Sequence, residues 1–519
     1  MQKPITTSSV NTSPTLNKGA LPTGSPLVAD RNSRTAPMSL IRNMKQYILG
    51  DEEGSQGKDD TGDIISQGII SEAMANELLS GYKHLPISLQ TQFDLCSRFS
   101  KLSRRWLFMK SNPAKLRSKA PLLFASCVLA GIQIDTSHHG TKLHVDLYHH
   151  VSSLLGKAMI TSPLPLETIQ SMLIFSMWNH IPNRDAEHLD TWLLSGVAGM
   201  QGMLAINFEQ LLVLRTDGLV DPRSRETLRS WNLICLVHLQ FSVGTGRPPV
   251  ISGQYLKQCK NILSLGSYNS RDQMVALGIE LYDSLCTLVN ADTVQTDSVV
   301  WIEVEDWKRK CGEFFDLDST KPLRFAYSCS YLILARRSLK YLSELPSTPP
   351  ANSQFSTADR SVEPTELFNL AVEHALRILH LFLAMSDLTN FVRPAYENLL
   401  CSFAMVTISE FAMYLEDPEE TLGLMERTSQ HVQRGGKAEP VSKWALGVMQ
   451  RFVHDLPNAT SEVGQRQDGY SEHVLEDHTS MGTGGKNLGG FLGGLESEWG
   501  QFGVPYDEFP SLEEMFLGN

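Results

Sequence analysis

The sequence predicts an all-α protein in which one large multi-helix domain lies between disordered N- and C-terminal tails. Three observations support this prediction. From Asp63 to about Leu456, apolar residues recur every three or four positions, as in helices, and alternating strand patterns are almost absent. Both ends of the chain are rich in Ser, Thr, Pro or Gly. The 519 residues are 42% hydrophobic, which is enough for a substantial core.

The N-terminal arm comprises residues 1–62. It is rich in Ser, Thr, Pro and Gly and then strongly charged, so it cannot bury enough apolar surface to offset chain entropy. Within it, Met38, Ile41, Met44 and Ile48 have helical spacing, which predicts a short transient or partner-bound helix. The start of the arm lacks the charged segment and apolar core of a secretory signal, so we expect no export.

The domain is predicted to comprise residues 63–456, and its first helix begins near Ser71. The Ser71 side chain is placed to cap that helix, and one face carries Ala75, Leu78, Leu79 and Tyr82.

Two later segments predict buried helices. Ser118 is placed to start a helix through PLLFASCVLAGI, and Pro163–Trp178 is apolar almost all round, as expected at the centre of a core. The longest strongly apolar stretch, Leu122–Ile132, is shorter than the roughly 20 residues that a membrane helix needs. We therefore expect no membrane association.

A surface linker, residues 344–366, interrupts the helical pattern. Its sequence is ELPSTPPANSQFSTADRSVEPTE, and helical periodicity resumes through NLAVEHALRILHLFLAM and ENLLCSFAMVTISEFAMYL. The core is thus split in sequence, and we expect it to be continuous in space.

The C-terminal tail, residues 457–519, turns polar and Gly-rich and ends in an acidic-aromatic segment, residues 495–519. This segment has no Lys or Arg, and its acidic residues keep the interleaved apolar side chains solvated and available to a partner's groove. It is predicted to be an activation segment that recruits transcription machinery or a coactivator; the alternative is a tail that docks on its own domain. The candidate partner-binding residues are Trp499, Phe502, Tyr506, Phe509, Leu512 and Phe516.

Charge and cysteine content limit the kinds of binding site that the chain can have. A net charge of −12 argues against a broad phosphate-binding surface, so any DNA contact must be local. The eight cysteines include no C-x-x-C pair and lie in apolar, helical contexts, which predicts reduced core residues.

No pattern predicts catalysis. The tail glycines follow no strand, G-x-S-x-G is absent, and no pair of acidic residues is placed for general acid and base work. In TSHHGTKLHVDLYHHVSS, His139, His144 and His149 are five apart, so they point in different directions on a helix; we expect a solvated helix start there. The sequence thus predicts no enzyme, no catalytic residue, no metal ligand and no cofactor.

One stretch is more specific. HLDTWLLSGVAGMQGMLAINFEQLL and RSRETLRSWNLICLVHLQFSVGTGRPPVISGQYLKQCKNIL together resemble the middle homology region of fungal zinc binuclear cluster (Zn2Cys6) transcription factors. That region has a Trp-bearing helix, a small-residue helix, an Arg and a Trp that open another helix, and a closing Gly-Arg-Pro. The matching positions are Trp192, Gly196, Ala205, Arg229, Trp231, Gly246, Arg247 and Pro248.

The resemblance covers about residues 63–400. ISQGIISEAMANELLSGYKHL and LRSKAPLLFASCVLAG look like the opening of this domain in the branch that contains the leucine-biosynthesis activator. DTWLLSG, LRSWN, HLQFSVG and VEDWKRK look like the filamentous-fungal activator of secreted proteases within that branch. The resemblance implies a nuclear regulator of RNA polymerase II transcription, in which the helical domain is regulatory and the set of target genes is metabolic or encodes secreted proteases.

The matching residues also have a physical interpretation. In Gly-Thr-Gly-Arg-Pro-Pro, Gly246 supplies backbone freedom and Pro248 ends the helix, so Arg247 is interpreted as a structural clasp on helix-end carbonyls. Trp192 and Trp231 are interpreted as core aromatics.

The sequence departs from this family in one respect: no six-cysteine zinc block is present. Zinc is therefore expected only with a cluster that precedes these residues, and DNA binding only through such a cluster or a DNA-bound partner. The leading interpretation is a transcription activator that forms a homodimer or a heterodimer with a related factor. The alternative is a co-regulator that lacks its own DNA-binding domain.

Overall fold

The computed structural model describes residues 118–454 except 133–139, 179–180, 183–188, 212–220, 266–267, 292, 345–362, 387–392, 433–440 and 444. These residues all belong to the second of two compact units, which comprises residues 56–519. The proposed arm helix near Met38, the helix near Ser71, the linker interior and the activation segment lie outside the described residues.

The described residues form helices and no strand, so the prediction of an all-α fold is confirmed. The α-helices and 3-10 helices are, in order, α6 (Pro121–Ile132), α7 (Lys142–Met159), α8 (Leu166–Met177), α9 (Thr191–Ala205), α11 (Pro222–Thr245), α12 (Gly253–Leu256), η3 (Lys257–Ser264), α13 (Ser270–Val289), α14 (Ile302–Cys311), η4 (Gly312–Asp316), η5 (Asp318–Thr320), α15 (Lys321–Glu344), α16 (Pro364–Ser386), α17 (Ala395–Glu410), η6 (Ala412–Tyr414) and α18 (Pro418–His431).

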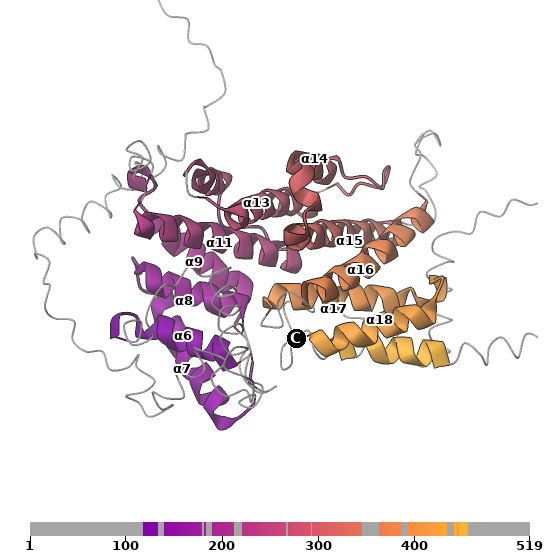
Figure 1. Ribbon diagram of the computed structural model, residues 1–519, viewed down its shortest axis with the longest axis horizontal. Helices are drawn as coiled ribbons and strands as arrows, with labels where there is room; N and C mark the ends of the chain where they lie inside the picture. The colour runs from indigo at the N-terminus through magenta and orange to yellow at the C-terminus, as the bar shows by residue number, and fades with distance from the viewer. Residues whose placement is uncertain are drawn as a thin grey trace, which may run out of the picture. The chain divides into compact units, whose positions relative to one another are not determined.

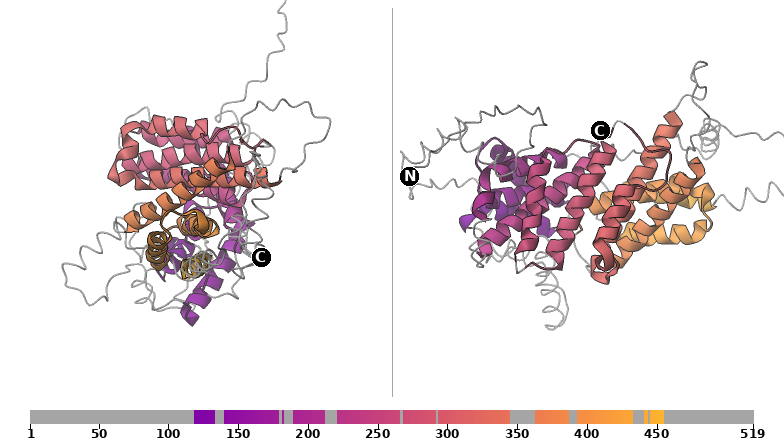
Figure 2. Two further views of the ribbon diagram at one scale, coloured as in Figure 1. Left: turned by 90° about the vertical axis from the view of Figure 1, so that its right-hand side faces the viewer. Right: turned by 90° about the horizontal axis from the view of Figure 1, so that it is seen from above.

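The helices pack largely in chain order. Helix α8 lies between α6 and α9, and α9 lies against α11 (Figure 1). Helix α11 packs on α13, and α13 packs on α15. Helix α15 then packs on α16, and α17 and α18 both contact α16 (Figure 2). Helix α17 also contacts α8, so the last helices return to the first ones. One hydrophobic core includes residues from both sides of the linker 344–366, from α6 to Met449. This agrees with the expectation that the core is split in sequence and continuous in space.

Helix α8 is the most completely buried of the early helices, as its all-round apolar sequence predicts. All its residues from Ile169 to Met177 are buried. The helix starts at Leu166, three residues later than Pro163, because Pro165 has an extended backbone with ψ 152° and serves as the N-cap.

Helix α16 meets the length and hydropathy criteria for a membrane span over Pro364–Met385, and no other helix among the described residues does. Its buried residues, including Leu367, Ala371 and Phe382, belong to the common core, and it contacts α15, α17 and α18. These contacts are those of a core helix.

Two expectations about polar residues can be compared with the structure. The described cysteines are all free, and only Cys127 is partly exposed, which confirms the predicted reduced core residues. The solvated helix start predicted for the histidine-rich stretch is wrong for His144. That side chain is buried in α7, and its Nδ1 accepts the Gly140 backbone N–H at 3.3 Å, whereas His149 is exposed on another face.

Candidate functional site

The residues that carry the sequence motif lie where α9 meets α11 and the turn that follows it. Trp192 and Gly196 lie on α9, Arg229 and Trp231 lie on α11, and Gly246, Arg247 and Pro248 directly follow α11. The structure thus brings together residues that are up to 56 positions apart in sequence.

Glycines three residues apart allow close packing on one side of α9. A Cβ atom at Gly199 would lie 2.7 Å from Ile251 Cδ1, and one at Gly202 would lie 3.0 Å from Trp231 Cζ3. A Cβ at Gly196 would lie 3.3 Å from the His238 ring. The small residues of the motif therefore place the α9 backbone directly on α11 side chains and on the turn after α11.

Trp231 is the aromatic centre of this contact. Its side chain is fully buried, and Phe208 meets it edge to face with ring centroids 5.2 Å apart. The Tyr255 ring lies 6.2 Å away on a third segment. Trp231 therefore joins α9, α11 and the segment before η3 through packing alone.

Gly246 ends α11 in the left-handed conformation, with φ +63°. Its N–H donates to the Val243 carbonyl at 3.2 Å, and the Arg247 N–H donates to the Ser242 carbonyl at 3.0 Å. These two bonds form a Schellman motif, which satisfies carbonyls that the helix itself leaves open. Pro248 follows immediately and prevents continuation of the helix.

Arg247 connects this turn to the start of α9. Helix-end carbonyls are the partners expected from the sequence; the structure gives a carboxylate instead. Its Nη1 lies 2.5 Å from Asp190 Oδ2, and its guanidinium lies 5.0 Å from the centre of the Trp192 ring. Asp190 is also the N-cap of α9 and accepts the Leu193 N–H at 3.0 Å. Arg247 therefore joins the end of one helix to the beginning of another.

His238 lies beneath these residues, two helical turns after Trp231. Its Nε2 accepts the Val250 N–H at 2.9 Å, so its proton is on Nδ1, which donates to Ser195 Oγ at 3.2 Å. Burial lowers the pKa of His238 to about 4, although a hydrogen bond to the Trp192 backbone opposes the shift. The neutral ring therefore ties α11 to both α9 and the turn after α11.

Neither His238 nor the pairing of Asp190 is among the features predicted from the sequence. For Asp190 the signal is its position directly before an apolar helix. For His238 the only signal is its spacing from Trp231 on the buried face of α11.

Arg229 pairs with Asp272 at the opposite end of α11. The two groups form a bidentate salt bridge, with Nε to Oδ1 and Nη2 to Oδ2 both at 2.7 Å, and Asp272 is only 3% exposed. The Asp272 carboxylate also accepts the Asn269 N–H at 3.0 Å and completes the capping box of α13. One carboxylate thus caps α13 and ties it to α11.

The VEDWKRK segment forms a second polar contact, between α14 and its neighbours. Glu305 Oε1 accepts the hydroxyl protons of Tyr327 at 2.5 Å and Tyr331 at 2.6 Å. Burial by itself raises the pKa of Glu305, but these hydrogen bonds and nearby cations together lower it below its ordinary value. Trp307 Nε1 donates to the Leu277 carbonyl on α13 at 2.8 Å. The segment therefore fixes α14 to α13 and α15.

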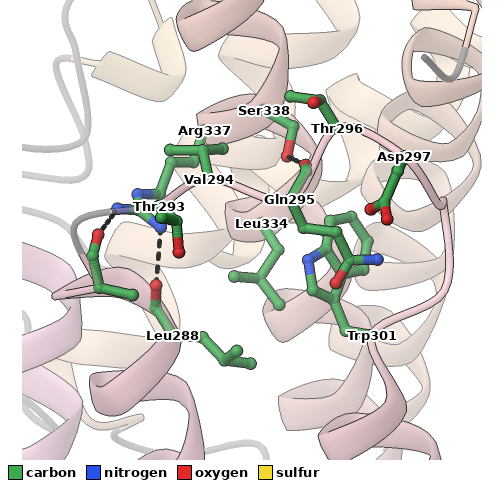
Figure 3. Close-up of a pocket in the computed structure, with 11 residues that line it drawn as sticks. Leu288, Thr293, Val294, Gln295, Thr296, Asp297, Trp301, Leu334, Arg337 and Ser338 are labelled. Atoms are coloured by element: carbon green, nitrogen blue, oxygen red, sulfur yellow. Dashed lines mark hydrogen bonds between the residues drawn. The ribbon is translucent and has the colours of Figure 1, made fainter. Parts of the chain in front are cut away.

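An open pocket lies between the segment after α13 and helix α15 (Figure 3). It encloses about 410 Å³, and its lining includes Trp301, Leu334 and Arg337. Arg337 Nη1 and Nη2 donate to the Leu288 and Ala291 carbonyls, each at 2.6 Å, and burial lowers the pKa of Arg337. Hydrogen bonds from Arg337 thus hold the pocket wall in place, and the cavity beside it remains open.

The polar groups of the motif contact and of its neighbour, the α11–α13 pair, bind one another. In the motif contact of α9 and α11, the ring nitrogens of His238, the Asp190 carboxylate and the Arg247 guanidinium bind other protein groups. Between α11 and α13, the Asp272 carboxylate binds Arg229. Such an arrangement fixes the positions of helices.

Comparison with known proteins gives one family match. A family model, that of the middle domain of the transcriptional activator of proteases prtT, matches residues 86–417. The match thus starts later and ends later than the 63–400 expected from the motifs.

Individual relatives agree with this match. The chain is 28% identical over 301 residues to the "Transcriptional activator of proteases prtT" of Aspergillus niger, covering 57% of this chain and 45% of that protein. It is 23% identical over 303 residues to the protein of the same name in Penicillium rubens, covering 58% and 44%. An uncharacterized transcriptional regulatory protein of Schizosaccharomyces pombe is 22% identical over 405 residues, covering 70% and 74%.

The chain therefore spans somewhat less than half the length of the curated protease activators that it matches. No solved structure matches it.

Proposed function

Because the chain belongs to the family defined by the middle domain of the prtT protease activators, we propose that it is a fungal transcription activator and that its helical domain is regulatory. The observation that carries this proposal is the match over residues 86–417, which includes every residue of the motif contact between α9 and α11. The internal pairing of the polar groups in that contact supports a structural and regulatory domain over an enzyme.

The proposed location is the nucleus, and the proposed target genes encode secreted proteases or related metabolic functions. The relatives' names support this choice of genes. Deletion of the gene should lower the transcripts of secreted proteases more than those of unrelated secreted enzymes, as measured by RNA sequencing. Unchanged protease transcripts would contradict this target set.

The activation function is assigned to residues 495–519. Fused to a foreign DNA-binding domain, this segment should activate a reporter gene that carries the matching operator. Replacement of Trp499, Phe502, Phe509 and Phe516 by Ala should abolish activation, because aromatic side chains supply most of the energy of such contacts.

A matched control replaces Glu496, Glu498, Glu513 and Glu514 by Gln in the same fusion. It should reduce activation less than the aromatic replacements do, because the acidic residues mainly keep the segment solvated. A silent wild-type fusion would remove the activation function from this segment and favour the tail that docks on its own domain.

DNA contact is the second part of the proposal. The chain has no C-x-x-C pair, so specific DNA binding is assigned to a zinc cluster in the same polypeptide or to a DNA-bound partner, as a homodimer or heterodimer. Sequencing of the 5′ end of the transcript distinguishes the two. A six-cysteine block in frame upstream of Met1 would support an activator that binds DNA itself.

A transcript without such a block would favour the co-regulator alternative. In that case, affinity purification of the 519-residue chain from nuclear extract should recover a related factor that has the zinc cluster. Specific binding of the purified chain alone to protease promoter DNA would contradict both versions of the assignment.

A further inference from the structure

We propose that the pocket between the segment 288–301 and α15 binds a small zwitterion, an amino acid or a short peptide, with its carboxylate at Arg337 and its ammonium group at Asp297. This inference goes beyond the proposed function, because it assigns a ligand class to a site outside the motif contact. It rests on the hydrogen bonds that hold the pocket in shape, on two charges that form no salt bridge among the described residues, and on the apolar side chains that line the space between them.

The pocket is held in shape by its own hydrogen bonds. Ser338 Oγ donates to the Gln295 carbonyl at 2.8 Å, and Gln295 Nε2 donates to the Ser298 and Val300 carbonyls at 3.1 and 2.9 Å. Together with the two bonds from Arg337, these contacts anchor the segment to α15 at two points, as Figure 3 shows. Because the walls are already ordered, a ligand would not have to order them on binding.

Arg337 supplies a positive charge that has no counter-charge among the described residues. Its guanidinium has five N–H donors, and the two bonds that it makes go to neutral carbonyls. No carboxylate of the described residues lies within salt-bridge distance of it. A half-buried guanidinium in this situation favours an anion, and a carboxylate matches its planar donors.

Asp297 supplies the complementary negative charge. It lies on the far side of the pocket from Arg337 in Figure 3, with Leu334 and Trp301 between them. Its side chain is exposed, and it forms no salt bridge with a cation of the described residues, Arg337 included. Among the residues that the structure describes, these two are the only charged ones that line the pocket. A pocket with one unpaired cation and one unpaired anion fits a ligand that carries both charges.

The space between the charges has mixed polarity. Leu288, Val294, Leu334 and the Trp301 ring supply apolar surface, and Thr293 and Thr296 supply hydroxyl groups. The volume of about 410 Å³ lies within the range of small-molecule sites, roughly 300–1,000 Å³, and equals that of about fourteen water molecules. An aliphatic amino acid or dipeptide matches this combination of size, apolar side chain and two charged ends.

Calorimetric titration of the purified 519-residue chain tests the inference with four probes: leucine, leucyl-leucine, N-acetyl-leucyl-leucine and leucyl-leucine amide. We expect leucyl-leucine to bind, and removal of either terminal charge to weaken its binding at least tenfold. Comparison of leucine with leucyl-leucine tells an amino-acid site from a peptide site. Absence of binding by both at millimolar concentration would overturn the proposal.

Variants assign each charge to its residue. Asp297→Asn should weaken leucyl-leucine binding about tenfold and leave the weaker binding of the N-acetyl derivative unchanged, because that ligand has no ammonium group. The matched control, Asp316→Asn, removes an exposed carboxylate outside the pocket. It should leave the binding of both leucyl-leucine and its N-acetyl derivative unchanged. An equal effect of Asp297→Asn on both ligands would contradict the proposed orientation.

Arg337 also anchors the segment, so its substitution can disturb the pocket itself. Arg337→Lys keeps the charge but loses the planar donors, and should weaken leucyl-leucine more than leucyl-leucine amide. The amide experiment on the wild-type chain keeps the test independent of that variant. Equal binding of leucyl-leucine and its amide to the wild type would overturn the role of Arg337. These measurements involve no promoter or reporter, so their failure would leave the proposed transcription function untouched.

Discussion

The motif contact between α9 and α11 and the pocket beside α15 are both rich in polar groups, but they use them differently. In the contact, His238, Asp190 and Arg247 bind protein groups, and three glycines of α9 leave no room between the helices. Beside it, Asp272 of α13 binds Arg229 of α11. In the pocket, neither Arg337 nor Asp297 has a counter-charge within the described part of the chain, and about 410 Å³ is open.

This difference separates two roles of polar residues in one helical domain. Polar groups that are paired inside a tight contact determine the relative position of helices, and their loss should cost stability. Unpaired charges around an open space contribute little to folding and are available to a ligand. The following predictions test the closed contact and the neighbouring pair of Arg229 and Asp272, from the largest expected effect to the smallest.

Trp231→Ala should have the largest effect. It empties the centre of the contact and should lower the free energy of unfolding by about 3–5 kcal/mol, as measured by urea denaturation. Trp192→Ala is the control, because Trp192 is only partly buried and should cost less than half as much. Equal losses would mean that the contact has no single aromatic centre.

Asp272→Asn comes next. It removes the carboxylate charge that pairs with the Arg229 guanidinium, which is 12% exposed, and it weakens the cap of α13, so we expect a loss of about 3 kcal/mol in the free energy of unfolding. The control is Asp306→Asn, because Asp306 is 55% exposed and pairs with Arg309 on the surface. That change should stay within about 0.5 kcal/mol. If Asp272→Asn also lowered the free energy of unfolding by only about 0.5 kcal/mol, its salt bridge with Arg229 would contribute no more than a surface salt bridge.

Acid should weaken the contact through His238. Its pKa is about 4 in the folded chain and 6.5 in the reference state, so the unfolded chain binds the proton more readily. Stability is therefore complete above pH 6.5 and falls as the pH decreases from 6.5 to about 4, by about 2 kcal/mol at pH 5.

His238→Gln isolates this effect. Gln can still accept the Val250 N–H, but it does not titrate. The free energy of unfolding of the variant should therefore fall less between pH 7 and pH 5 than that of the wild type. His374, whose pKa burial and Arg377 lower to about 3, titrates in both proteins and cancels in the difference. Identical pH profiles would show that His238 is not a neutral link in the contact.

Arg247→Ala should have the smallest effect. Its salt bridge with Asp190 is partly exposed, and together with the contact to Trp192 it should contribute about 1 kcal/mol at most. A double-mutant cycle with Asp190→Ala should give a coupling energy of about 0.5–1 kcal/mol. A coupling near zero would mean that the two residues of the clasp act independently.

Much of the fold could be predicted from the sequence because it depends on local patterns. Helical periodicity predicts α8 and α16, and a Gly-Arg-Pro sequence predicts the end of α11 at Gly246. Cysteines in apolar contexts indicate buried thiols, and six of the described ones are buried. The start of α8 is three residues off, because two nearby prolines obscure the boundary.

The site was harder to predict because its partners are distant in sequence. Arg247 and Asp190 are 57 residues apart, and Arg229 and Asp272 are 43 apart, so no periodicity relates them. The pocket depends on a non-helical segment whose path is determined by Arg337 and Ser338 of a later helix. Such contacts follow only from the packed structure.

The double use of Asp272 changes how α13 opens. The first turn of an isolated helix frays readily, because its N–H groups have few partners. Here the carboxylate that completes the cap of α13 also holds Arg229 on α11, so the first turn is stabilised from outside its own helix. We therefore expect hydrogen exchange in that turn to require the separation of α13 from α11, so that the first turn of α13 opens together with α11.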